Sequence, residues 1–124
     1  MRAINRLRHN DDFRLSTRTG VRAARSHVMV HLALIDSPED RRAQREPRVG
    51  FVVSKKVGNA VVRARTKRRL RPILDARLAD LPPYAAVVVR TQPGIDQLTH
   101  AELVGEVDGA LRSALTKHHA RRGA

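Results

Sequence analysis

The sequence predicts an α/β (α+β) fold in which one small sheet packs against helices as a two-layer sandwich. Two observations support this class. Short runs rich in β-branched residues are typical of strands, and longer stretches with apolar residues every three or four positions are typical of helices. We expect a single domain at residues 1–118, followed by a basic, frayed tail at residues 119–124.

The first elements are short. Asn10, with the two acids that follow it, predicts the start of a helix that runs to about Arg18. Gly20 is a candidate left-handed cap for that helix, and residues 21–25 form a candidate short strand. The next strands are expected at residues 27–35 (HVMVHLALI) and 48–54 (RVGFVVS). With the polar loop 36–47 between them, they suggest an antiparallel hairpin.

A change of period then predicts a helix. Asn59 is a good N-cap, and the apolar positions from residue 60 to residue 81 have roughly helical spacing. Pro72 lies inside this stretch and predicts a kink or two abutting helices.

With the elements of the C-terminal third, the sequence predicts about four strands and three helices in total. The almost wholly apolar run 84–91 predicts a central strand. Thr99 and Glu102 have capping-box spacing and open a last helix, 101 to about 118. Its apolar stripe is Leu103, Val107, Leu111 and Leu115.

Charge indicates the class of partner. Twenty-five Lys and Arg against twelve Asp and Glu give a net charge of +13, which favours a polyanion and, first of all, nucleic acid. We expect no membrane partner, because there is no apolar run of about twenty residues and no signal peptide. The absence of Cys excludes disulfides, thiolate metal sites and Cys nucleophiles, and it suits a cytoplasmic protein.

The sequence predicts a basic face built from the first 71 residues. Residues 55–71 include no acid and residues 1–25 add seven Arg, whereas the last third is nearly balanced and looks structural. Arg63, Lys67 and Arg71 are four residues apart and share one helix face. The candidate RNA-binding residues are Lys55, Lys56, Arg63, Arg65, Lys67, Arg68, Arg69 and Arg71. A solvated basic face without a specific ligand is the alternative.

Other candidates carry weaker signals. The turn 54–59 could contact phosphate or be an ordinary turn with two exposed lysines. His27 and His31 share a strand face, but no histidine has zinc-site spacing, so we expect no metal site. Nothing places a pair of histidines for acid–base work near the basic helix, so we expect no catalytic side chain. Phe13 could stack on an unpaired base or anchor its helix in the core.

The stretch from Arg48 to Arg71, RVGFVVSKKVGNAVVRARTKRRLR, resembles the signature of the bacterial ribonuclease P protein family. Leu7, Phe13 and Gly20 also match the opening of that family. The resemblance implies a fold similar to the second domain of ribosomal protein S5, with a left-handed βαβ crossover where the general rule predicts a right-handed one.

The resemblance also implies a function. The family's protein partners a catalytic RNA that removes the 5′ leader from precursor tRNA, with Mg²⁺ held mainly by the RNA and no small-molecule substrate. By the same resemblance, Arg63, Arg65, Lys67 and Arg68 contact the catalytic RNA. The leader-binding cleft comprises Phe13, Thr17, Lys67 and Arg71.

Three positions depart from the family pattern. Ala64 stands where Asn is usual, Thr17 where a second Phe is common, and Pro72 is unexpected. Two other functions stay open: a self-sufficient protein ribonuclease, and a ribosomal or other structural RNA-binding protein. The first would need a His or acid pair, and the second would leave tRNA processing untouched.

Overall fold

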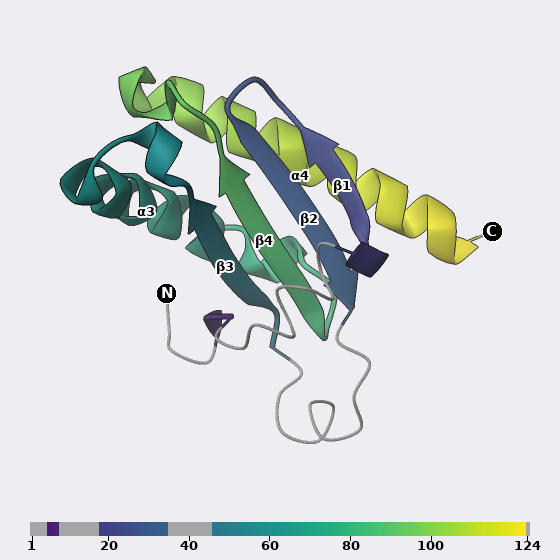
Figure 1. Ribbon diagram of the computed structural model, residues 1–124. Helices are drawn as coiled ribbons and strands as arrows, with labels where there is room; N and C mark the ends of the chain where they lie inside the picture. The colour runs from purple at the N-terminus through teal and green to yellow at the C-terminus, as the bar shows by residue number, and fades with distance from the viewer. Residues whose placement is uncertain (1–4, 8–17, 35–45, 124) are drawn as a thin grey trace.

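The computed structural model describes residues 5–7, 18–34 and 46–123, and for residues 122 and 123 only the backbone. The described chain forms a four-stranded sheet with two α-helices, as Figure 1 shows. The first expected helix lies almost entirely outside the described residues, as does most of the loop 36–47. The elements are β1 (Val21–Ala24), β2 (Val28–Leu34), β3 (Arg48–Val53), α3 (Ala60–Asp75), β4 (Ala85–Thr91) and α4 (His100–Gly123), with short 3₁₀ turns η2 (Lys55–Val57), η3 (Leu78–Asp80) and η4 (Ile95–Gln97).

The sheet has the strand order β1-β2-β4-β3, and β4 is central, as expected. β2 pairs antiparallel with β1 and β4, whereas β3 pairs with β4 in parallel. The expected hairpin between β2 and β3 is therefore wrong. The physical reason is that Ala85 to Val89 are fully buried, so the most apolar strand takes the position between them. The left-handed crossover and the likeness to ribosomal protein S5 stay predictions.

Both helices cover the same face of the sheet (Figure 1). α3 packs mainly against β3, and α4 packs against β1 and β2. The predicted stripe of α4 is confirmed, since Leu103, Val107 and Leu111 are buried and Leu115 packs against the core at its margin. On the opposite face, Leu7 covers part of the sheet.

The N-terminal residues 5–7 run along the free edge of β3. The Leu7 backbone N–H donates to the Val49 carbonyl at 3.0 Å, and Asn5 Nδ2 donates to the Pro47 carbonyl at 2.9 Å. Arg6 forms a parallel bridge with Val49. These contacts extend the sheet beyond β3.

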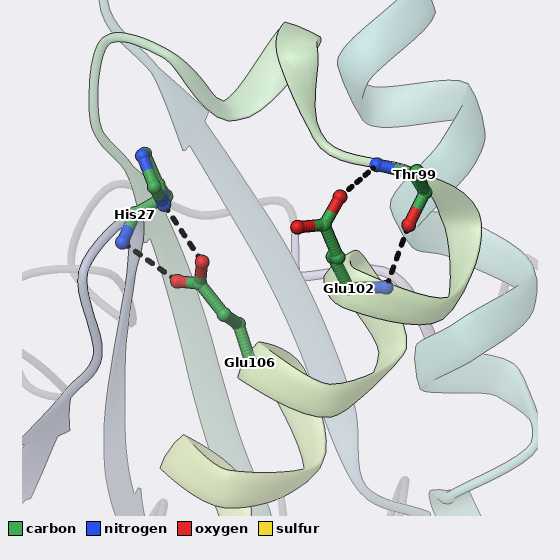
Figure 2. A network of polar contacts seen from close by, with 4 residues as sticks. All are labelled: His27, Thr99, Glu102 and Glu106. Atoms are coloured by element: carbon green, nitrogen blue, oxygen red, sulfur yellow. Dashed lines mark hydrogen bonds and ion pairs between the residues drawn. The ribbon is translucent and has the colours of Figure 1, made fainter.

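The predicted caps of both helices are confirmed. Asn59 has extended backbone, and its side chain accepts a hydrogen bond from the Val62 N–H at 2.9 Å. Figure 2 shows the capping box of α4, in which Glu102 Oε1 accepts from the Thr99 N–H at 2.9 Å and Thr99 Oγ1 accepts from the Glu102 N–H at 3.1 Å. Both helix starts are therefore encoded locally.

His27 lies in the turn before β2 and not in the strand where the sequence placed it. Its backbone N–H donates to Glu106 Oε1, and its Nδ1 lies 2.7 Å from Glu106 Oε2 (Figure 2). One carboxylate of α4 thus holds the β1–β2 turn.

Four local expectations are corrected. α3 continues through Pro72, so two abutting helices are wrong, and α3 ends at Asp75 although helical spacing ran to residue 81. Gly20 does not have the positive φ of a left-handed cap; a Cβ there would lie 2.0 Å from the Leu32 carbonyl oxygen, so the position needs glycine for close strand approach. α4 continues to Gly123, beyond the expected end near residue 118.

Neither of the two described helices is long and apolar enough to cross a membrane.

Candidate nucleic-acid interface

The eight cations predicted to bind RNA are carried by η2 and α3, next to the edge strand β3. Lys55 and Lys56 are exposed in η2, directly before the capped start of α3. Gly58 lets the two elements meet closely, since a Cβ there would lie 2.8 Å from a methyl group of Val62. We call the eight residues the α3 face: Lys55, Lys56, Arg63, Arg65, Lys67, Arg68, Arg69 and Arg71.

One row of the α3 face lies beside the core. Thr66, Leu70, Ile73 and Leu74 are the buried residues of α3, and Arg63, Lys67 and Arg71 follow along one flank of that stripe, each half-buried. Half-buried Lys and Arg side chains cover apolar surface with their aliphatic stems.

The remaining cations of α3 do not all point the same way. Arg65 and Arg68 are exposed on the solvent side, beside Val61, whose side chain is 65% exposed. Arg69 is on the other flank, and its guanidinium donates to the Leu98 carbonyl at 2.7 Å. The predicted surface is therefore divided: Arg69 ties α3 to the segment before α4, whereas the other cations of α3 are available to a ligand.

The α3 face is not neutralised from within its own segment, because residues 55–71 contain no acid. Arg63 Nε is buried and has no hydrogen-bond acceptor in the part of the chain that the structure describes. A buried donor without an acceptor costs about 1 to 3 kcal/mol. An anionic ligand that accepts a hydrogen bond from this donor would remove that cost. Its binding free energy would therefore be more favourable here than at an ordinary solvated helix.

A second cationic group lies on the sheet face opposite the helices, and sequence reasoning missed it. Arg22 of β1 and Arg90 of β4 flank the buried His31 of β2, and register pairs His31 with Arg22 and Val88. Burial first, and then the charges of Arg90 and Arg22, hold the pKa of His31 below its ordinary value. Only strand register could have found this group, because its members come from three separate strands.

The predicted leader-binding cleft is only partly described. Lys67 and Arg71 lie together on one flank of α3, as expected. Phe13 and Thr17 lie outside the described residues. The predicted placement of those two residues therefore stays a prediction.

An open groove of about 500 Å³ lies between the end of α3 and α4. Arg77 Nε and Nη2 donate to the two carboxylate oxygens of Asp108 at 2.7 and 2.8 Å, so these two charges in the groove are paired with each other. Hydrogen bonding to Arg77 holds the pKa of Asp108 below its ordinary value. The groove is held by structural contacts, in contrast to the α3 face.

Comparison with known proteins identifies the family. The family model described as Ribonuclease P matches residues 1–115. The chain is 47% identical over 113 residues to the ribonuclease P protein component of Streptomyces griseus, covering 90% of this chain and 92% of the relative. It is 49% identical over 111 residues to that of Beutenbergia cavernae, covering 90% and 88%.

Solved structures agree on the fold. The RNase P protein of Staphylococcus aureus superposes with a TM-score of 0.75 at 23% identity, covering 89% of this chain and 94% of that chain. The RNase P protein of Thermotoga maritima superposes with a TM-score of 0.68 at 21% identity, covering 84% and 92%. The chain therefore belongs to the ribonuclease P protein family, whose members are protein components of a tRNA-processing endoribonuclease that is a ribonucleoprotein.

Proposed function

We propose that this chain binds the catalytic RNA of ribonuclease P through the α3 face and assists that RNA in removing the 5′ leader from precursor tRNA in the cytoplasm. One observation carries the proposal: a segment of seventeen residues, 55–71, has eight cations and no acid, on a capped helix fixed against the sheet. Phosphate groups offset the repulsion between the cations along this helix. They also accept hydrogen bonds from its guanidinium groups.

We propose further that the leader lies beside Lys67 and Arg71 and crosses the sheet face opposite the helices. The cations Arg22 and Arg90 support this path, because they extend positive charge across that face. Two substitutions against the family pattern weaken leader affinity in this proposal. Ala64 cannot make the polar contact of an Asn, and Thr17 offers no ring for base stacking.

Mg²⁺ enters the proposal only as an ion held by RNA. Lys and Arg side chains have no acceptor atoms and cannot ligate a cation, so the α3 face does not fit a metal. Among the described residues, no three His, Asp or Glu side chains gather in a group that could hold a metal ion. We propose that the protein raises metal and substrate affinity by offsetting phosphate repulsion, so that the two RNA molecules approach each other at lower Mg²⁺ concentrations.

A reconstitution assay tests the proposal. A ribonuclease P RNA from a related bacterium is mixed with precursor tRNA at low Mg²⁺, with and without the protein. We expect faster release of the 5′ leader when the protein is present, and no cleavage by protein alone. Equal rates with and without the protein would overturn the proposed role, and cleavage by protein alone would support the self-sufficient ribonuclease.

A further inference from the structure

A second cationic surface lies along β1, at the opposite edge of the sheet from α3. The C-terminal half of α4 runs beside this strand (Figure 1). The sequence suggested that the last third of the chain is structural, yet it contributes two of the cations. We call this surface the edge patch: Arg18, Arg22, Arg25, Lys117 and Arg121.

Hydrogen bonds assemble the edge patch from distant parts of the chain. Lys117 Nζ donates to the Arg22 carbonyl at 2.8 Å, and Arg121 Nη1 donates to the Thr19 carbonyl at 3.4 Å. Arg25 Nη2 donates to the Gly109 carbonyl of α4 at 3.2 Å. The fold therefore brings together cations that are 84 to 102 residues apart from their partners in sequence.

The charges of the edge patch are not neutralised by carboxylates within the described part of the chain. All five side chains are exposed, and the acceptors of Arg25, Lys117 and Arg121 are backbone carbonyls. The nearby acids are engaged elsewhere, Glu106 with His27 and Asp108 with Arg77.

Protection of an edge strand is one explanation for such cations, because charged side chains prevent pairing with another chain. One charged side chain among the four residues of β1 would be enough for that purpose. Five cations on one edge repel each other, in a chain whose net charge is already +13. A polyanionic partner explains the surplus.

We propose that the edge patch binds the phosphate backbone of a double-helical segment of the ribonuclease P RNA, an inference that rests on the proposed function above. Lys117 and Arg121 each donate to one backbone carbonyl but, unlike the half-buried Arg69, they stay exposed, so they offer positioned positive charges to a rigid, regular row of phosphates. Within the described residues, the Phe and Tyr side chains are Phe51 of β3 and Tyr84 before β4, and neither belongs to β1 or α4, which disfavours a single-stranded leader at the patch.

The position of the edge patch implies that it contacts a different RNA segment from the α3 face. The order β1-β2-β4-β3 separates the two edges by three strand spacings, about 14 Å. The sheet thus holds two phosphate-binding edges apart, and the contributions of the two edges to affinity are separable.

The test compares matched variants of the whole protein. The edge variant Lys117→Gln with Arg121→Gln is compared with Arg112→Gln, which removes an exposed cation from the groove side of the same helix. Binding to ribonuclease P RNA without tRNA is measured between low and moderate salt. We expect the edge variant to flatten the slope of log K against log salt by about 0.7 to 0.9 for each phosphate that is no longer neutralised, and the control to leave it unchanged.

A third variant, Arg22→Gln, guards against damage to the fold. The Arg22 carbonyl, and not its side chain, accepts the hydrogen bond from Lys117, so this change removes charge from the patch without removing that hydrogen bond. Thermal unfolding of each variant shows whether the sheet edge stays intact. Because Arg22 also lies on the proposed leader path, its variant is scored with ribonuclease P RNA in the absence of tRNA. A flattened slope under that condition, at an unchanged Tm, supports the inference.

The outcomes separate this inference from the proposed function. If the wild-type protein fails to bind the RNA or to accelerate cleavage, the proposed function itself fails. If the wild type binds and the α3 face is needed, but both edge variants keep the wild-type slope, the inference is overturned. It is also overturned if the edge variants lose affinity only for precursor tRNA, or if Arg112→Gln flattens the slope as much as they do.

Discussion

The two helices on one face of the sheet use their charged residues in opposite ways. In the first half of α4 each acid has a partner: Glu102 caps the helix with Thr99, Glu106 holds His27, and Asp108 pairs with Arg77. Residues 55–71, which include most of α3, have eight cations and no acids. The first half of α4 therefore uses its charges within the protein, whereas most cations of α3 remain available to a ligand.

This difference teaches that the groups facing an arginine, and not its place in a basic run, decide its role. Arg69 lies within the most basic segment of the chain but is held by the Leu98 carbonyl. Its neighbour Arg68 is exposed and makes no such contact with the residues that the structure describes. Arg77 lies just after α3 and is fixed by a carboxylate of α4.

The largest effect is expected from removing charge on α3. Replacing Arg63, Arg65 and Lys67 together with Ala keeps good helix formers in place, so the fold should remain intact. We expect the salt dependence of RNA binding to flatten by about 0.7 to 0.9 for each phosphate that these side chains no longer neutralise. Filter binding at several salt concentrations measures the slope, and circular dichroism checks the fold. An unchanged slope would show that the α3 face is not the RNA site.

The next-largest effect tests α4, the helix whose acids are paired. Asp108→Asn removes the charge that holds Arg77, and we expect a loss of about 1 kcal/mol in the free energy of unfolding. RNA affinity should be unchanged. Because the folded pKa of Asp108 is lowered, its stabilisation is present above the ordinary pKa of an Asp and is lost as pH falls through the folded pKa.

Denaturant unfolding at pH 7 and at acidic pH measures this contribution. Asp96→Asn is a matched control, because the side-chain hydrogen bond that Asp96 accepts within the described residues is an exposed one from Gln97. Equal stability of the two variants at pH 7 would contradict the assigned role of the Arg77–Asp108 pair. Reduced RNA affinity in Asp108→Asn would break the distinction between the two helices.

A smaller effect separates two adjacent arginines. Arg69→Gln loses the bond to Leu98, and we expect about 0.5 to 1 kcal/mol of lost stability with little change in RNA binding. Arg68→Gln should show the reverse, with unfolding within about 0.5 kcal/mol of wild type and weaker RNA binding. Thermal unfolding and RNA titration of the pair measure both quantities. The distinction fails if the two variants behave alike.

The sequence predicted the elements better than their arrangement. Both caps, the central strand and the stripe of α4 were predictable because each depends on neighbours within a few residues. The parallel pairing of β3 with β4 was missed, because it depends on competition among strands for the buried central position. Likewise, the spacing of α3 predicted its charged flank, but only the fold shows that Arg69 is occupied by Leu98 and that Lys117 approaches Arg22.

The smallest predicted effect concerns the sheet face opposite the helices. It tests whether the cations on that face bind a ligand, as we propose for those of α3. Arg22 and Arg90 contribute, after burial, to the lowered pKa of His31. The unfolded chain therefore binds a proton more readily than the folded protein, so His31 should reduce stability as pH falls below about 6.5 toward its folded pKa. His31→Gln should remove this part of the pH dependence, measured by denaturant unfolding between pH 5 and pH 7.5. If an RNA leader crosses this face, its phosphates offset the two arginines, and NMR titration of His31 should show the pKa rising on binding. If a bound leader leaves the pKa of His31 unchanged, the leader does not cross this face. The cations of this face would then act within the protein, as the charges in the first half of α4 do, and the substrate would bind at α3.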